Sequence, residues 1–153
     1  MKTERPSDEE LKELIEVYGP PSFKERQVHL EGVEYKADKQ ESKGKAVIEV
    51  KKDGMVAGVI SRDGKKYVLP QGDVSVDEGF VEGARRICYE ETGVEVKIIR
   101  LKEIRRIQIK YFDELVERWY FLFETEMIEE ELKKKEFEGI KFLEEVSWEE
   151  VYQ

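Results

Sequence analysis

Apolar residues along the chain recur at two different spacings, and each spacing predicts a different element. Near the N-terminus they recur every three or four positions, which predicts an amphipathic helix over residues 7–18. Ser7 and Glu10 form a capping-box pair at its start, and a glycine followed by two prolines ends it. A second helix is predicted over residues 80–92, closed by Gly93.

Between and after these helices the pattern favours strands. Asp53-Gly54 is a strong hairpin turn signal between two apolar runs. Residues 37–44 and 71–79 are expected to be loops, and Ser147 to begin a short C-terminal helix. Strands are predicted over residues 46–50, 55–61, 65–69, 94–101, 104–112, 117–125 and 140–143.

The run over residues 117–125 indicates how these elements pack. Trp119 and Phe121 fall on one face of this strand, whereas Tyr120 and Leu122 fall on the other. Apolar residues on both faces imply a sheet that is covered on both sides. We therefore expect a mixed β-sheet between helical layers, in one domain that carries an N-terminal extension.

The composition excludes several classes of function. The chain has 153 residues and a net charge of -9, which argues against nonspecific binding to nucleic acid or to anionic membranes. One cysteine, Cys88, and one histidine, His29, leave no intramolecular disulfide and no multi-histidine metal site. No apolar run is long enough to span a membrane. We expect a cytoplasmic protein whose metal ions, if any, are hard cations held by carboxylates.

The candidate chemistry lies at the C-terminal end of the second helix. Glu90 and Glu91 place two adjacent carboxylates where the helix dipole is also negative, so both need compensation. Arg86, four residues earlier, can supply some of it, and a divalent cation would supply more. Glu78 stands where the helix is about to begin, a favourable place for a carboxylate. The alternative is a solvated acidic helix end.

The stretch over residues 69–94 resembles the Nudix box, G-x5-E-x7-R-E-U-x-E-E-x-G-U, where U is a bulky apolar residue. Eight of its nine specified positions match in spacing, namely Gly72, Glu78, Arg86, Cys88, Glu90, Glu91, Gly93 and Val94. The resemblance implies an α/β (α+β) fold of the Nudix type, an α/β/α sandwich with a mixed sheet. It extends over residues 45–153 and leaves residues 1–44, with the helix 7–18, as an N-terminal extension.

The resemblance also implies an activity. Nudix hydrolases use Mg2+ or Mn2+ to cleave a phosphoanhydride bond in a nucleoside diphosphate linked to another group. In this chain Glu90 and Glu91 would then be metal ligands, with Glu78 as a supporting acid, and Arg86 would orient the glutamates. The expected partner is a small nucleotide substrate. Dinucleoside polyphosphates or nucleoside triphosphates come first, and ADP-ribose-like compounds second.

Ile87 departs from the family pattern, which has a glutamate there as a metal ligand or as the base for water. One hypothesis is an enzyme that takes its base from a later segment, with Glu136 as the first candidate. The other is a domain that has lost catalysis and binds a nucleotide as a sensor or interaction module. The weaker candidates for the base are Glu138, Glu117 and Glu114.

Four residues are candidates for contact with the substrate. Tyr111 lies 17 residues after Val94. In this it resembles the dinucleoside polyphosphate hydrolases of the family, which have a tyrosine at about that distance. The alternative role for Tyr111 is packing in the core. Arg105, Lys110 and Arg118 could meet phosphates, or could pair with glutamates across strands. The N-terminal helix would either cover sheet surface left bare by the short C-terminal helix or form a homodimer contact.

Overall fold

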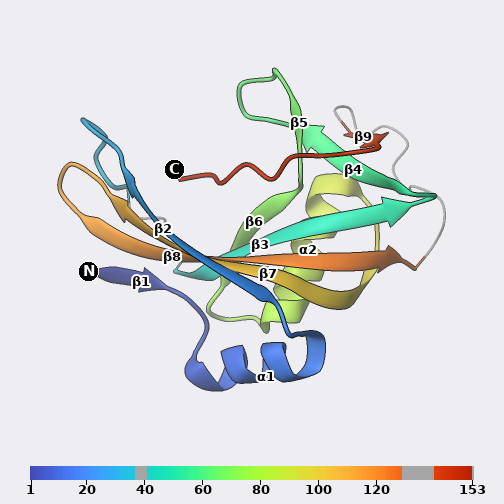
Figure 1. The fold of residues 1–153 in the computed structure, drawn as a ribbon, viewed down its shortest axis with the longest axis horizontal. Helices are drawn as coiled ribbons and strands as arrows, with labels where there is room; N and C mark the ends of the chain where they lie inside the picture. The colour runs from blue at the N-terminus through green and yellow to red at the C-terminus, as the bar shows by residue number, and fades with distance from the viewer. Residues whose placement is uncertain (37–40, 129–139, 153) are drawn as a thin grey trace.

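A computed structural model describes residues 1–36, 41–128 and 140–152 of the chain. Within these residues, nine strands form one mixed sheet, whose main path runs in the order β2-β7-β8-β3-β4-β5 (Figure 1). Three further strands pair beside this path, β1 with β8, β6 with β3 and β9 with β4. The elements are β1 (Lys2–Glu4), α1 (Asp8–Tyr18), β2 (Ser22–His29), β3 (Ser42–Lys52), β4 (Met55–Ile60), β5 (Tyr67–Val68), β6 (Gln71–Ser75), α2 (Phe80–Thr92), β7 (Val96–Lys110), β8 (Leu115–Met127) and β9 (Ile140–Leu143).

The two faces of the sheet are covered differently. Both α1 and α2 pack on one face, where Leu14 and Ile87 join a core that includes Phe121 and Phe123. The other face, built around Tyr120 and residues of β7, is covered by the segment after β2 and by the C-terminal segment. Figure 1 shows α1 and the C-terminal segment on opposite sides of the strands. The expected fold class, a mixed sheet with helices, is confirmed, but the expected helical layer on each face is not: both described helices lie on one face, and extended segments cover the other.

Several predicted elements agree closely with the structure. The N-cap Ser7 accepts a hydrogen bond from the Glu10 amide at 3.2 Å, and α1 follows it. The prediction of α2 is confirmed at both ends, because Gly93 adopts the left-handed conformation at φ 73° and donates to the Tyr89 carbonyl. Asp53 and Gly54, both at positive φ, close the predicted hairpin between β3 and β4.

Other predictions were wrong, because the elements concerned form through pairing between distant segments. The expected loop over residues 71–79 contains β6, which pairs antiparallel with β3. The expected loop before residue 45 ends earlier, since β3 already begins at Ser42. The two strands predicted over residues 94–112 are the single strand β7, interrupted by bulges rather than by a turn.

The predicted C-terminal helix does not form in the described part of the chain. Residues 148–152 are irregular, and Ser147 instead bridges to Val68. Ser147 and Leu69 also share a backbone hydrogen bond of 3.1 Å. The C-terminal segment therefore lies along the sheet in an extended form, held by contacts with β5 and the residues after it.

The segment before residue 45 belongs to the same sheet. The strand β1 pairs in parallel with β8, and β2 pairs in parallel with β7 over eight residues. A side-chain contact reinforces this arrangement, because the buried Glu4 accepts a hydrogen bond from Arg118 at 2.5 Å. None of the described helices is both long enough and apolar enough to cross a lipid bilayer.

Candidate active site

The helix α2 sits close to β6 because small residues separate them. A Cβ added at Gly83 would lie 2.7 Å from Val74, and one added at Gly72 would lie 3.1 Å from Ile87. This close approach lets α2 pack directly against β6. The glutamates of the helix and the residues around Gly72 thus share one region of the surface.

Arg86 connects three parts of this region. Its guanidinium donates three bonds to the Glu78 carboxylate, at 2.7, 3.0 and 3.3 Å, and one to Glu90 at 3.0 Å. It also donates to the Asp73 carbonyl at 3.0 Å. The hydrogen bonds between Arg86 and Glu78 lower the pKa of the Glu78 carboxyl and raise the pKa of the Arg86 guanidinium, so both groups stay charged at neutral pH. Arg86 thus contacts both Glu78 and Glu90, and its pairing with Glu90 agrees with their spacing of four residues.

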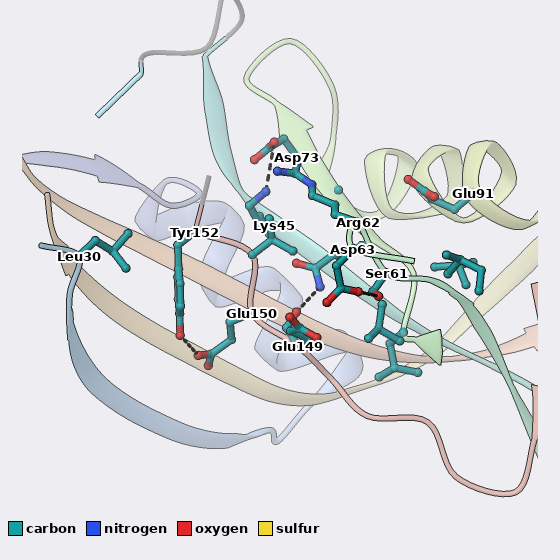
Figure 2. A pocket seen from close by; sticks show the side chains of 17 residues that line it. Leu30, Lys45, Ser61, Arg62, Asp63, Asp73, Glu91, Glu149, Glu150 and Tyr152 are labelled. Atoms are coloured by element: carbon teal, nitrogen blue, oxygen red, sulfur yellow. Dashed lines mark hydrogen bonds and ion pairs between the residues drawn. The ribbon is translucent and has the colours of Figure 1, made fainter. Parts of the chain in front are cut away.

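Glu91 is in a different situation from its neighbour. Its carboxylate lines a cleft of about 570 Å³ together with Gly72 and Asp73, and no hydrogen bond to it is among those described (Figure 2). Desolvation raises the pKa of Glu91, and the adjacent charge of Glu90 raises it further. A carboxylate placed in this way is stabilised by an approaching cation.

The same cleft contains a buried lysine. Lys45 is 6 % exposed, and its ammonium lies 3.4 Å from the Asp73 carboxylate. Burial lowers the pKa of Lys45, although the Asp73 charge opposes this. Figure 2 shows Lys45 between Glu91 at one end of the cleft and Tyr152 at the other. The cleft thus has a carboxylate at each end, Glu91 at one and Glu150 beside Tyr152 at the other, and a cation near its middle.

Ile87, which occupies the position of the missing glutamate, does not line this cleft. Its side chain is 3 % exposed, belongs to the core between α2 and the sheet, and lies beneath Gly72. An isoleucine at this position makes apolar contacts beneath β6. It supplies no oxygen to a metal ion and cannot accept a proton.

The donors that remain fit a hard divalent cation at one place. Glu91, which lines the cleft, and the adjacent Glu90 provide carboxylate oxygens, which Mg2+ and Mn2+ prefer. Glu78 lines a second, shallower hollow together with Asp77 and Arg86. Among the described residues, no group of three or more acidic, histidine or cysteine side chains is arranged to hold an ion. Substrate oxygens would have to complete the coordination.

A family model for the NUDIX domain matches residues 45–153. The chain belongs to the Nudix family. A search of curated protein sequences found no match. The stretch from Gly72 to Val94 is therefore a Nudix box that carries isoleucine in place of its first clustered glutamate.

Several solved structures align with this chain at low sequence identity. A UDP-X diphosphatase aligns with a TM-score of 0.50 at 17 % identity, over 90 % of this chain and 59 % of that protein. The chain thus spans less than two thirds of that relative. An ADP-ribose pyrophosphatase from Streptococcus suis aligns with a TM-score of 0.46 at 14 % identity, over 64 % and 70 % of the two chains. A Bacillus subtilis pyrophosphohydrolase aligns with a TM-score of 0.48 at 18 % identity, over 72 % and 66 %.

The predicted substrate-contact residues are spread over the Nudix fold. Arg105 lies against the Trp148 ring at 3.4 Å and pairs with Glu103 and Glu150. Arg118 is 5 % exposed and pairs with Glu4. Both basic residues thus have glutamate partners, the alternative recognised from the sequence.

Two further candidates lie away from the cleft. Lys110 borders a shallow hollow beside β2 together with His29 and Leu115. Tyr111 is 2 % exposed, packs in the core of the second face and donates a hydrogen bond to the Tyr152 carbonyl. The predicted base Glu136 lies outside the described residues, as does Glu138.

Sequence reasoning missed several residues of the cleft. Lys45 and Asp73 meet because β3 pairs with β6, in a segment expected to be a loop. Tyr152 and Glu149 reach the cleft because the C-terminal segment is extended rather than helical. For Lys45 one signal existed, since a lysine directly before the fully apolar run Ala46-Val47-Ile48 is difficult to keep in water.

Proposed function

We propose that this Nudix domain hydrolyses a phosphoanhydride bond in a nucleoside-diphosphate derivative with the help of a divalent metal ion. The observation that carries the proposal is Glu91, a carboxylate with a raised pKa beside Glu90 in a cleft that also contains Lys45. Two crowded acids at the negative end of a helix favour the capture of a cation. Mg2+ or Mn2+ bound there would neutralise phosphate charge and make water a stronger nucleophile.

Each residue of the site has a separate task in this proposal. Glu90 and Glu91 hold the ion. Arg86 keeps Glu90 in place and connects α2 to β6 through its bond to the Asp73 carbonyl. Glu78 supports Arg86 rather than the ion, because both of its oxygens accept from the guanidinium. Lys45 donates to a substrate phosphate near the middle of the cleft.

The general base is proposed from a segment other than the Nudix box. Ile87 cannot serve, since its side chain is apolar and buried in the core. Glu136 remains our candidate, because it precedes β9, which pairs with β4 next to the cleft. In this role its carboxylate would accept the proton of the attacking water.

The substrate class follows from the length and polarity of the cleft. A ligand that extends from Glu91 to Tyr152 passes a carboxylate, a buried lysine and then an aromatic ring that lies beside Glu150 (Figure 2). Dinucleoside polyphosphates and nucleoside triphosphates fit this order, and ADP-ribose-like compounds are the second choice. UDP-X diphosphatase is the name of a protein with a similar fold, which adds nucleoside diphosphates linked to other groups to the panel.

A second function is favoured by one observation. Because Ile87 fills the space beneath Gly72, the site has one carboxylate fewer than the family pattern. A domain with this site could bind a nucleotide and a metal ion without turnover, as a sensor or interaction module. Cytoplasmic location and a homodimer contact through the N-terminal helix are parts of the proposal that depend on neither function.

A hydrolysis assay with a broad nucleotide panel and Mg2+ or Mn2+ separates the two functions. Wild type should release phosphate or a nucleotide, and Glu90→Gln should reduce kcat by about 100-fold or more, because a metal ligand is lost. Glu13→Gln, which alters an exposed carboxylate on α1, is the matched control and should leave kcat unchanged. Metal-dependent nucleotide binding without turnover would support the sensor and would overturn hydrolysis.

A further inference from the structure

A second cavity adjoins the cleft at its aromatic end. This tyrosine hollow, of about 620 Å³, is lined by Tyr35, Tyr111 and Tyr152, by Arg118, and by Gly32, Val33, Glu34 and Lys36. Tyr152 lines both cavities, so the hollow begins where the cleft ends. Glu91 lies at the opposite end of the cleft from Tyr152 (Figure 2). The volume of the tyrosine hollow is in the usual range for small-ligand sites.

Residues outside the part of the chain matched by the family model build one wall of this hollow. The Tyr35 hydroxyl accepts a hydrogen bond of 2.8 Å from Lys2 of β1. The Tyr35 amide donates to Asp113 at 3.1 Å, and the Phe112 amide donates to the Val33 carbonyl at 2.7 Å. The segment that carries Tyr35 is therefore attached at both its backbone and its side chain to the sheet.

Tyr111 supports the Tyr35 ring from within the core. The rings of Tyr35 and Tyr111 are in contact, with centroids 5.3 Å apart at an angle of 59°, and the buried Tyr111 is fixed by its hydrogen bond to the Tyr152 carbonyl. The Tyr35 ring is partly exposed and held in place, so it provides a surface on which a flat ring can stack. Such stacking accepts any base, because every base has a π face.

The charges decide which part of a nucleotide fits here. In the hollow, Arg118 is paired with Glu4, and the other charged lining residues, Glu34 and Lys36, have opposite signs. The cleft is lined by two cations, Lys45 and Arg62, and by Glu91, the proposed metal ligand. A neutral, flat group suits the hollow, while phosphates suit the cleft.

We propose that the tyrosine hollow binds the nucleobase of the substrate, so that residues 1–44 supply part of the binding site through Tyr35. The proposal rests on the proposed function in one respect, because it assumes that the phosphates of the same ligand occupy the cleft. Tyr35 is a binding residue in this scheme. The bond from Lys2 to the Tyr35 hydroxyl is one of several contacts that attach this segment to the sheet.

Binding of nucleoside monophosphates without metal tests this proposal separately from hydrolysis. The dissociation constants of AMP, GMP, CMP and UMP are measured by calorimetry in EDTA, for wild type and for Tyr35→Leu. Leucine keeps apolar volume but removes the π face, so the preferred nucleotide should bind about 5- to 150-fold more weakly. Tyr35→Phe should stay within about twofold of wild type, because it keeps the ring.

Phe112→Ala is the matched control, since Phe112 is an exposed aromatic residue that neighbours Tyr111 but does not line the hollow. It should leave the dissociation constants unchanged, and circular dichroism confirms that each variant is folded. Equal affinities of wild type and folded Tyr35→Leu, or no binding of any monophosphate by wild type, would overturn the proposal. Weaker binding by Tyr35→Leu in a protein that hydrolyses nothing would uphold this site and reject the proposed hydrolysis.

Discussion

The acidic residues of β8 and its surroundings differ in one respect from those at the end of α2. Glu4 is 1 % exposed and is paired with Arg118, and the buried Glu117 accepts from Arg106 at 3.0 Å and from Trp119 at 2.8 Å. Glu91, in contrast, lines the cleft beside Glu90, with which it shares a charge of the same sign.

The directions of the pKa shifts express this difference. Burial alone would raise the pKa of Glu117, but bonds from Arg106 and Trp119 outweigh it, so the pKa is lowered. The pKa of Glu91 is raised, first by desolvation and then by Glu90. The first region is complete within the protein and stabilises the fold. The second becomes favourable only when something positive is added, as expected of a binding site.

The largest effect is expected where a buried pair is broken. Glu4→Ala leaves Arg118 charged and buried without its carboxylate, which should lower the free energy of unfolding by about 3–5 kcal/mol. Chemical denaturation measures this change. A loss below about 1 kcal/mol would show that β1 does not hold the pair in solution, and the contrast between the two regions would fail.

A smaller effect is expected at Lys45, which lies between the two regions and is influenced by both Glu4 and Asp73. Lys45→Met keeps the length of the side chain but removes the donor to phosphate. KM should rise by about tenfold, which is the usual effect of losing one charged hydrogen bond. Lys110→Ala is the comparison, since Lys110 borders a different hollow, and it should leave KM unchanged. The reverse result would move the phosphates to the surface beside β2.

The stability at low pH should depend on Glu117. Its pKa is below 4.5 in the folded chain, so the stability it adds is complete above the unfolded pKa. That stability is lost as the pH falls through 4.5 towards the folded value. Glu117→Gln should therefore narrow the difference in unfolding free energy between pH 7 and pH 3 by about 1 kcal/mol. Parallel pH curves for the two proteins would contradict the lowered pKa.

The smallest effect has the opposite sign. Glu91→Gln removes a negative charge from the negative end of a helix, next to another carboxylate. Without metal, the variant should be more stable than wild type by about 0.3–1 kcal/mol at pH 7. Thermal unfolding in EDTA measures the gain. A less stable variant would indicate that Glu91 has a partner within the protein and is not reserved for a ligand.

The sequence predicts the parts of the molecule that depend on neighbouring residues. The helix α2 follows from its periodicity and from Gly93, and the contact of Arg86 with Glu90 follows from their spacing of four. Both depend on interactions within one or two turns, which the order of residues encodes directly.

What the sequence does not reveal depends on distant pairing. The strand β6 forms because β3 offers it a partner, and this pairing brings Lys45 to Asp73. The C-terminal segment stays extended because Ser147 bridges to Val68 and its carbonyl accepts a hydrogen bond from the Leu69 amide. Tyr35 reaches Tyr111 for the same reason, since 76 residues separate two rings that the sheet places together.

The capture of a cation by Glu90 and Glu91 is tested most directly by titrating the protein with Mn2+ and Mg2+. Calorimetry compares wild type with Glu90→Gln and Glu91→Gln, in the presence and absence of a nucleotide that is not hydrolysed. Wild type should bind the ion, more tightly with nucleotide, and each variant should bind it about 10- to 100-fold more weakly. No binding by wild type, or the same affinity in all three proteins, would contradict the assignment of the metal site.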